Sequence, residues 1–158
     1  PGDRMPTPTG KLIISILQGK MKHFFDGGLS AVDVRDVARG HVLAMEKGEI
    51  GQNYLLANKA GNMTQADFAR LVGDIAQVDD VATKEVPPWV MGASARVMEA
   101  WANLTGKTPM TNYKTSMYAM QKIYMDPGKA VKELGMPQTP IENAVKDSVQ
   151  WFRDNGYA

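Results

Sequence analysis

The sequence contains no cysteine among its 158 residues, which excludes disulfides, thiolate metal ligands and a thiol nucleophile. No apolar run reaches the roughly 18 residues of a membrane helix, and no signal peptide opens the chain. The sequence also lacks a large excess of charge of one sign, because its 18 Lys and Arg residues are nearly balanced by 17 Asp and Glu residues. A net charge of +1 argues against a nucleic-acid or acidic-membrane partner. We therefore expect a soluble, cytoplasmic protein.

Motifs for phosphate and metal binding are absent as well. Neither G-x-G-x-x-G nor G-x-x-x-x-G-K-[ST] occurs, and the nearest fragment, Gly106-Lys107-Thr108, is interpreted as a helix stop. His23 and His41 stand alone, without the helical His and carboxylate spacing of a metal site, so no metal is predicted. Asp33 and Asp36 bracket a helix start, where capping and the helix dipole account for them.

One catalytic pattern does occur, a Y-x-x-x-K formed by Tyr118 and Lys122. On a helix, this spacing places a phenol beside an ammonium, which can lower the tyrosine pKa for acid/base work. Five Tyr and 12 Lys in 158 residues give about 0.4 such matches by chance. No nucleotide-binding unit precedes the pair, so we interpret it as accidental.

Apolar periodicity and boundary residues predict mostly helix, with strands early in the chain. The predicted helices cover 11–18, 34–47, 65–78, 89–104, 112–120, 127–134 and 140–155, and the extended segments cover 23–25, 29–34, 52–58, 83–86 and 123–125. Thr9 is the expected cap of the first helix, and Thr64 with Asp67 forms a capping box for the third. The expected buried stripe of helix 34–47 is Val34, Val37, Ala38, Val42 and Met45.

These patterns describe an α/β protein in which βα alternation gives way to helix near residue 58. We expect two parts, 1–58 and 59–158. Many of the eleven Met lie between Met91 and Met125, which suits a pocket wall, a subunit contact or plain core packing. From the residues alone, no assembled active site is visible.

Three stretches resemble the C-terminal part of extended short-chain dehydrogenases/reductases, of the dihydroflavonol-4-reductase-like and NAD-dependent epimerase/dehydratase branch. They are Pro1-Gly2-Asp3 with Pro6-Thr7-Pro8-Thr9-Gly10, similar to a G-P-G-D loop; the run from Val32 to His41, similar to V-x-V-x-D-V-A-x-(A/G)-H; and Asp126 to Gly135 with Thr139-Pro140-Ile141-Glu142, similar to D-x-x-K-A-x-x-E-L-G-x-x-P-x-T-P-x-E. All three occur in the family's order, and together they span the chain.

The resemblance implies a piece of a longer enzyme. Family members carry a Rossmann half with a glycine-rich loop and catalytic Ser, Tyr and Lys, all expected upstream of Pro1, so no catalytic residue is assigned in this chain. NAD or NADP would be bound mainly by that upstream half. The part in hand would supply the last strands of the Rossmann-like fold and a smaller, mainly helical substrate-binding domain. Alone, it is expected to be inactive.

The same resemblance suggests where a substrate would bind. The expected substrate-binding residues are Pro1, Gly2, Thr7, Thr9, Leu29, Arg35, Tyr113 and Met117. Sugar-nucleotide epimerases place an Arg and an aromatic where this chain has Leu29-Ser30-Ala31, and bidentate pyrophosphate recognition favours Arg. A small carbonyl or alcohol substrate is therefore expected.

Two alternatives stay open: a nucleotide-sugar epimerase or dehydratase fragment, and a stand-alone, non-catalytic binding or oligomerisation module. The expected partners are a small-molecule substrate and the upstream Rossmann half, and a homodimer is left open.

Overall fold

The computed structural model describes residues 6–21, 27–79 and 121–158, together with positions 2, 23, 81, 87, 89, 90, 93 and 96. Its helices are α1 (Pro8–Leu17), α2 (Val34–Lys47), α3 (Gln65–Ala76) and α6 (Ile141–Asp154), with short turns η1 (Lys59–Gly61) and η2 (Ala130–Leu134). Strands β1 (Gly28–Ser30) and β2 (Asn62–Thr64) complete the described elements. This mixture of helices with a small sheet confirms the α/β class. The predicted elements over 83–86, 89–104 and 112–120 and the strand over 23–25 lie outside the described residues, save for isolated positions.

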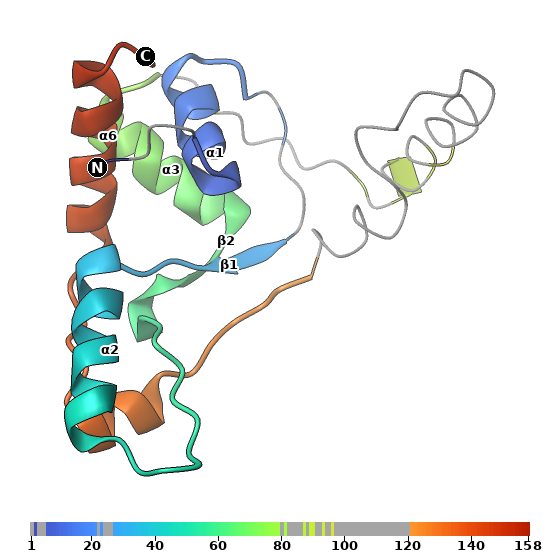
Figure 1. Ribbon diagram of the computed structural model, residues 1–158. Coiled ribbons are helices and arrows are strands. Elements are labelled where there is room, and N and C mark those ends of the chain that lie inside the picture. The colour runs from blue at the N-terminus through green and yellow to red at the C-terminus, as the bar shows by residue number, and fades with distance from the viewer. Residues whose placement is uncertain are drawn as a thin grey trace, which may run out of the picture.

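Helices α1, α3 and α6 pack together into one bundle (Figure 1). The inward side of α6 carries Ile141, Val145, Val149 and Phe152, each 3% exposed, at helical spacings of three and four residues. These side chains meet Ile13 and Ile16 of α1 and Phe68, Ala69, Val72 and Ala76 of α3. The bundle therefore joins the two ends of the described sequence around one apolar core.

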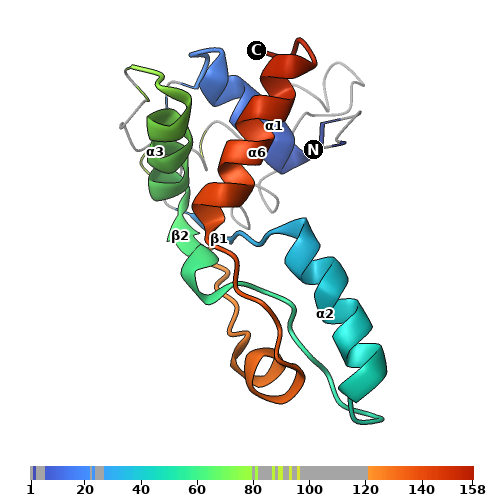
Figure 2. The ribbon, with the colours of Figure 1, turned by 90° about the vertical axis from the view of Figure 1, so that its left-hand side faces the viewer.

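Helix α2 stands apart from the bundle and packs against η2 (Figures 1 and 2). A second core cluster lies there, made of Leu43, Ala130, Leu134 and Met136, with Tyr54 and Leu56 against it. The C-terminal turn of α2 is tied to η2, since Lys47 Nζ donates to the Leu134 carbonyl at 3.3 Å.

The predicted apolar stripe of α2 is wrong. Val34 is 68% exposed and Met45 is 81% exposed, whereas the buried residues of the helix are Asp36, Gly40 and Leu43. A Cβ on Gly40 would lie 2.8 Å from Leu56 Cδ2, so the missing side chain is what lets segment 52–57 approach. A prediction from apolar periodicity does not count glycine or aspartate as buried residues. It therefore selects the wrong face of α2.

Helix boundaries follow the capping residues closely. Asp33 caps α2 and Thr64 caps α3 as predicted, with Asp67 N donating to Thr64 Oγ1 at 3.0 Å. The cap of α1 is Thr7 instead of Thr9, since Gly10 N donates to Thr7 Oγ1 at 3.2 Å and the helix starts at Pro8. Proline suits the first helical position because it lacks an N–H and has a helical φ.

The strands are shorter than predicted. The expected strand over 29–34 is reduced to β1, which pairs antiparallel with the distant β2 in the register Leu29 to Met63. The predicted strand over 52–58 is wrong, because this segment has no ladder partner among the described residues. Tyr54 and Leu56 pack on the second core, while Leu55 is 53% exposed. An apolar segment alone does not make a strand, since the ladder needs a second backbone.

Candidate functional site

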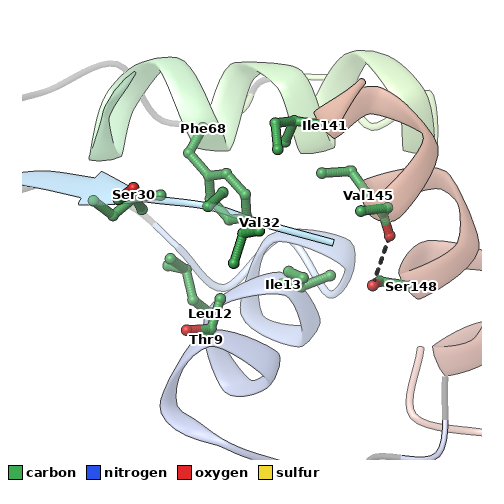
Figure 3. A pocket seen from close by; sticks show the side chains of 12 residues that line it. Thr9, Leu12, Ile13, Ser30, Val32, Phe68, Ile141, Val145 and Ser148 are labelled. Carbon is green, nitrogen blue, oxygen red and sulfur yellow. Dashed lines mark hydrogen bonds between the residues drawn. The ribbon is translucent and has the colours of Figure 1, made fainter. Parts of the chain in front are cut away.

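Two neighbouring cavities meet at a wall formed by Val32, Ala144 and Ser148. The first, which we call the inner cavity, has a volume of about 380 Å³ and lies between α1, β1, α3 and α6 (Figure 3). The second, the Arg35 cavity, has a volume of about 520 Å³ and lies beside the N-terminus of α2. Both volumes fall in the range of about 300–1,000 Å³ that is typical of small-molecule sites.

The inner cavity is mostly apolar. Its walls include Leu12 and Ile13 of α1, Phe68 of α3, and Ile141 and Val145 of α6. Three residues with hydroxyl side chains also line it, Thr9, Ser30 and Ser148, although the Ser30 oxygen itself is buried. A few polar groups in an apolar surround are the usual composition of a site that orients a small ligand.

The structure distributes the predicted site residues over both cavities. Thr9 and Leu29 line the inner cavity, and Gly2, Thr7 and Arg35 line the Arg35 cavity. Pro1, Tyr113 and Met117 lie outside the described residues.

Sequence reasoning missed Ser30 and Phe68 as lining residues. Ser30 directly follows a predicted site residue in the same strand, and this adjacency was an available signal. Phe68 carried no such signal, because its place depends on how α3 packs.

Arg35 is held by two carboxylates. Its Nε and backbone N donate to Asp33 Oδ1 at 2.9 and 2.8 Å, and its Nη2 lies 2.5 Å from Asp33 Oδ2 and 2.8 Å from Asp147 Oδ2. The hydrogen bond from Arg35 lowers the pKa of the Asp33 carboxyl against the opposing effect of burial, and the pKa of Arg35 is raised by the same bond. The guanidinium thus links α2 to α6, and its Nε and Nη2 donors are engaged by carboxylates.

This pair makes a prediction about acid stability. A carboxyl with a lowered pKa stabilises the folded state above its ordinary pKa of about 4, and this contribution is lost as the pH falls through the lowered value. Replacing Arg35 by Gln removes the cause of the lowering. We expect Arg35→Gln to be less stable than the native chain above about pH 5, and the difference to shrink below about pH 4. Urea unfolding at a series of pH values measures this, and a difference that does not depend on pH would contradict it.

A second carboxylate of α2 acts over a longer range. Asp36 is 4% exposed and accepts hydrogen bonds from Thr139 N at 2.7 Å and from Thr139 Oγ1 at 2.8 Å. The predicted role of Asp36 as a first-turn charge therefore misses its main contact. Thr139 immediately precedes Pro140 and α6, so this contact sets where α6 begins, and with it one wall of each cavity.

The remaining candidates assemble no further site within the described part of the chain. No group of three or more His, Cys, Asp or Glu side chains there could hold a metal ion. Lys122 of the Y-x-x-x-K pattern lies across from Gly28 in an isolated β-bridge, and Tyr118 lies outside the described residues. Among the helices the structure describes, none combines the length and apolarity needed to cross a membrane.

Comparison with known proteins gives long, consistent matches, although no family model matches the chain. It is 34% identical to a Synechocystis sp. protein named for dihydroflavonol 4-reductase, over 99% of this chain and 46% of that protein. It is 27% identical to sterol demethylase protein B of Methylococcus capsulatus, over 99% of this chain and 47% of that protein. The chain thus spans about half the length of the curated relatives it matches.

Solved structures agree with these matches. The crystal structure of gox2253 shares 35% identity at a TM-score of 0.82, over 99% of this chain and 47% of that one. PA4631, a nucleoside-diphosphate-sugar epimerase from Pseudomonas aeruginosa, shares 29% identity at a TM-score of 0.73, over 98% and 45%.

More distant structures share the fold at TM-scores of 0.60. They include Bordetella bronchiseptica WbmF with NAD+ and UDP, at 19% identity, and Pseudomonas aeruginosa RMD with NADPH, at 16%. In sequence and fold, the chain matches the C-terminal part of an extended short-chain dehydrogenase/reductase, over about half the length of these relatives.

Proposed function

We propose that this chain is the substrate-binding, C-terminal part of an NAD(P)-dependent oxidoreductase that acts on a small, largely apolar carbonyl or alcohol. The observation that carries the proposal is the inner cavity, whose walls are apolar and which no charged side chain lines among the described residues. The name of the Synechocystis relative, a reductase, and that of the Methylococcus relative, which refers to a sterol, agree with such a substrate.

A nucleotide-sugar substrate is the main rival, and PA4631 carries such a name. A pyrophosphate is bound best by a guanidinium with free donors. Arg35 is the one arginine among the described residues lining the two cavities, and its Nη2 is shared between Asp33 and Asp147. The charge it would offer is already balanced, so the geometry favours a reductase of uncharged substrates over an epimerase.

The cofactor is proposed to be NAD or NADP, held by an upstream half. The chain's own residues do not fit a dinucleotide, since the sequence has no glycine-rich phosphate loop. We propose that the catalytic groups also lie upstream and that this chain shapes the substrate side. Gly2, Thr7, Thr9, Leu29 and Arg35 remain the proposed lining residues, with Arg35 acting through its links to α2 and α6.

We keep the division of the chain into parts 1–58 and 59–158 as a proposal. Both core clusters draw residues from each part, because α1 packs with α3 and α6, and α2 packs with η2. The two parts are therefore proposed to fold together.

The surface around the second core favours the proposal that the chain is part of a longer enzyme over the alternative of a stand-alone binding module. Val34, Met45, Ile50 and Leu55 leave apolar side chains 53% to 104% exposed along α2 and the segment that follows it. A self-sufficient module is expected to cover such a surface with polar residues. Relatives about twice as long offer a further half that could cover it.

The proposed function is tested with a polypeptide extended upstream to the length of the relatives. We expect it to oxidise NADH or NADPH in the presence of aliphatic and aromatic ketones, with turnover at least tenfold above that with UDP-sugars. Continuous assays that follow nicotinamide absorbance give both rates.

The 158-residue chain alone is the control, and it is expected to be inactive in the same assay. A second readout is hydrogen exchange over 53–56, which should slow in the longer polypeptide as the exposed segment is covered. Turnover confined to UDP-sugars would contradict the proposal in favour of the epimerase alternative.

A further inference from the structure

Helix α2 has two faces that point away from each other, and only one of them is covered within the described part of the chain. The covered face holds Asp36, Gly40 and Leu43, and it packs against η2 and segment 52–57 (Figure 2). Residues two positions apart, such as Val34 and Asp36, point to nearly opposite sides of a helix. The opposite side, which we call the outer face, consists of exposed residues, namely Val34, Ala38, His41, Val42 and Met45.

The outer face has the composition of a surface that is to be buried. Val34, Val42 and Met45 belong to the large apolar side chains that the described residues leave exposed, and His41 is the one polar member of the face. The charged side chains of the exposed region lie along one flank of this face, at positions 35, 39 and 46. A helix that borders water on one side normally turns its charged residues to that side. The pattern of α2 is therefore that of a helix lying between two layers, of which the described residues form one.

The start of the described chain lies near the first residue of this face. Gly2 lines the Arg35 cavity together with Val34, so the two residues border the same space of about 520 Å³. A polypeptide that continues upstream of Gly2 therefore enters the molecule next to the outer face.

The relatives contain enough further chain to form the second layer. The curated relatives and the gox2253 chain match nearly all of this chain with about half of their own length. Upstream polypeptide thus has both the size and the point of entry to cover the outer face. A second copy of this chain has no such link to it, and we take the upstream polypeptide as the occupant.

We propose that the outer face of α2 is the docking surface for the polypeptide upstream of Pro1, which covers it with an apolar layer of its own. The inference rests on the proposed function for the existence of the upstream half, and it adds which surface of this chain holds that half. Two contacts tie α2 to α6 and the residue before it, namely Arg35 with Asp147 and Asp36 with Thr139. A half that docks on α2 is thereby held in a fixed position relative to both cavities.

Labelling of single introduced cysteines tests the docking surface, because the chain itself contains no cysteine. In the 158-residue chain, Met45→Cys should react with a maleimide at a rate similar to that of Asp154→Cys, which lies on the exposed side of α6. In the polypeptide extended upstream, labelling at position 45 should become about a hundredfold slower, since it then requires local opening. Labelling at position 154 is the matched control and should keep its rate. Mass spectrometry assigns the label to either position.

A charge at the same position gives a second readout. Met45→Lys should lower the thermal midpoint of the extended polypeptide by about 5–10 °C, because the ammonium would be buried against an apolar layer without a partner. In the 158-residue chain, where the side chain is exposed, the shift should stay below about 2 °C. Met45→Leu keeps the position apolar and should leave both midpoints nearly unchanged.

Equal labelling rates at position 45 in the two polypeptides would overturn the inference, since the outer face would then be open in both. Labelling at position 45 of the 158-residue chain that slows as its concentration rises would assign the face to a second copy and overturn the inference as well. Neither experiment needs cofactor or substrate. A reductase assay that fails on a correctly docked polypeptide therefore contradicts the proposed function and not the docking surface.

Discussion

Phe68→Ala is expected to lower the free energy of unfolding by about 4 kcal/mol, the middle of the range for truncating a buried phenylalanine. Phe68 is 3% exposed and belongs to the core that α1, α3 and α6 share. Phe68 also lines the inner cavity, so its truncation enlarges an empty space that is already present. Urea unfolding followed by circular dichroism gives the change.

Phe68→Leu is the matched control, because it keeps an apolar side chain of closer volume, and it should cost less than about 1.5 kcal/mol. A loss below about 1 kcal/mol for Phe68→Ala, well under the usual range, would show that the ring does not carry the packing between the helices.

Asp36→Ala is expected to lower the free energy of unfolding by about 3 kcal/mol, because it removes the carboxylate whose Oδ2 accepts from Thr139 N and whose Oδ1 accepts from Thr139 Oγ1. Hydrogen bonds to a charged group contribute about 1.5–3 kcal/mol each, and two partly buried donors would lose their partner together. The contact joins residues 103 positions apart, and it therefore secures the start of α6 against α2. The same urea unfolding experiment measures the loss.

Asp154→Ala provides the comparison on the exposed side of α6. Asp154 accepts a hydrogen bond from the Gln150 side chain, and its loss should change the stability by less than about 0.5 kcal/mol. Thr139→Val is a second probe of the pair, since it removes one donor and leaves the backbone bond in place. Equal losses of stability for Asp36→Ala and Asp154→Ala would refute the proposal that Asp36 holds the start of α6 against α2.

Sequence alone determined the features that depend on neighbours along the chain. Asp33 and Gly48 bound α2, and Thr64 caps α3, because a cap is a contact between residues two to four positions apart. The resemblance to extended short-chain dehydrogenases/reductases was likewise readable from ordered motifs. Near-neutral charge and the lack of cysteine narrowed the classes of partner and chemistry, because both depend on composition and not on folding.

Only the tertiary structure decided which surfaces meet. The buried side of α2 contains Asp36 and Gly40, and neither is apolar enough to be chosen from a periodic pattern. Their burial depends on Thr139 and Leu56, which arrive from distant parts of the sequence. Among the described residues, the hydroxyl of Ser30 is buried without a hydrogen-bond partner, and this too is a property of the assembled neighbours. Interactions between residues close in the sequence therefore specify the helix boundaries, while packing between distant residues specifies the site.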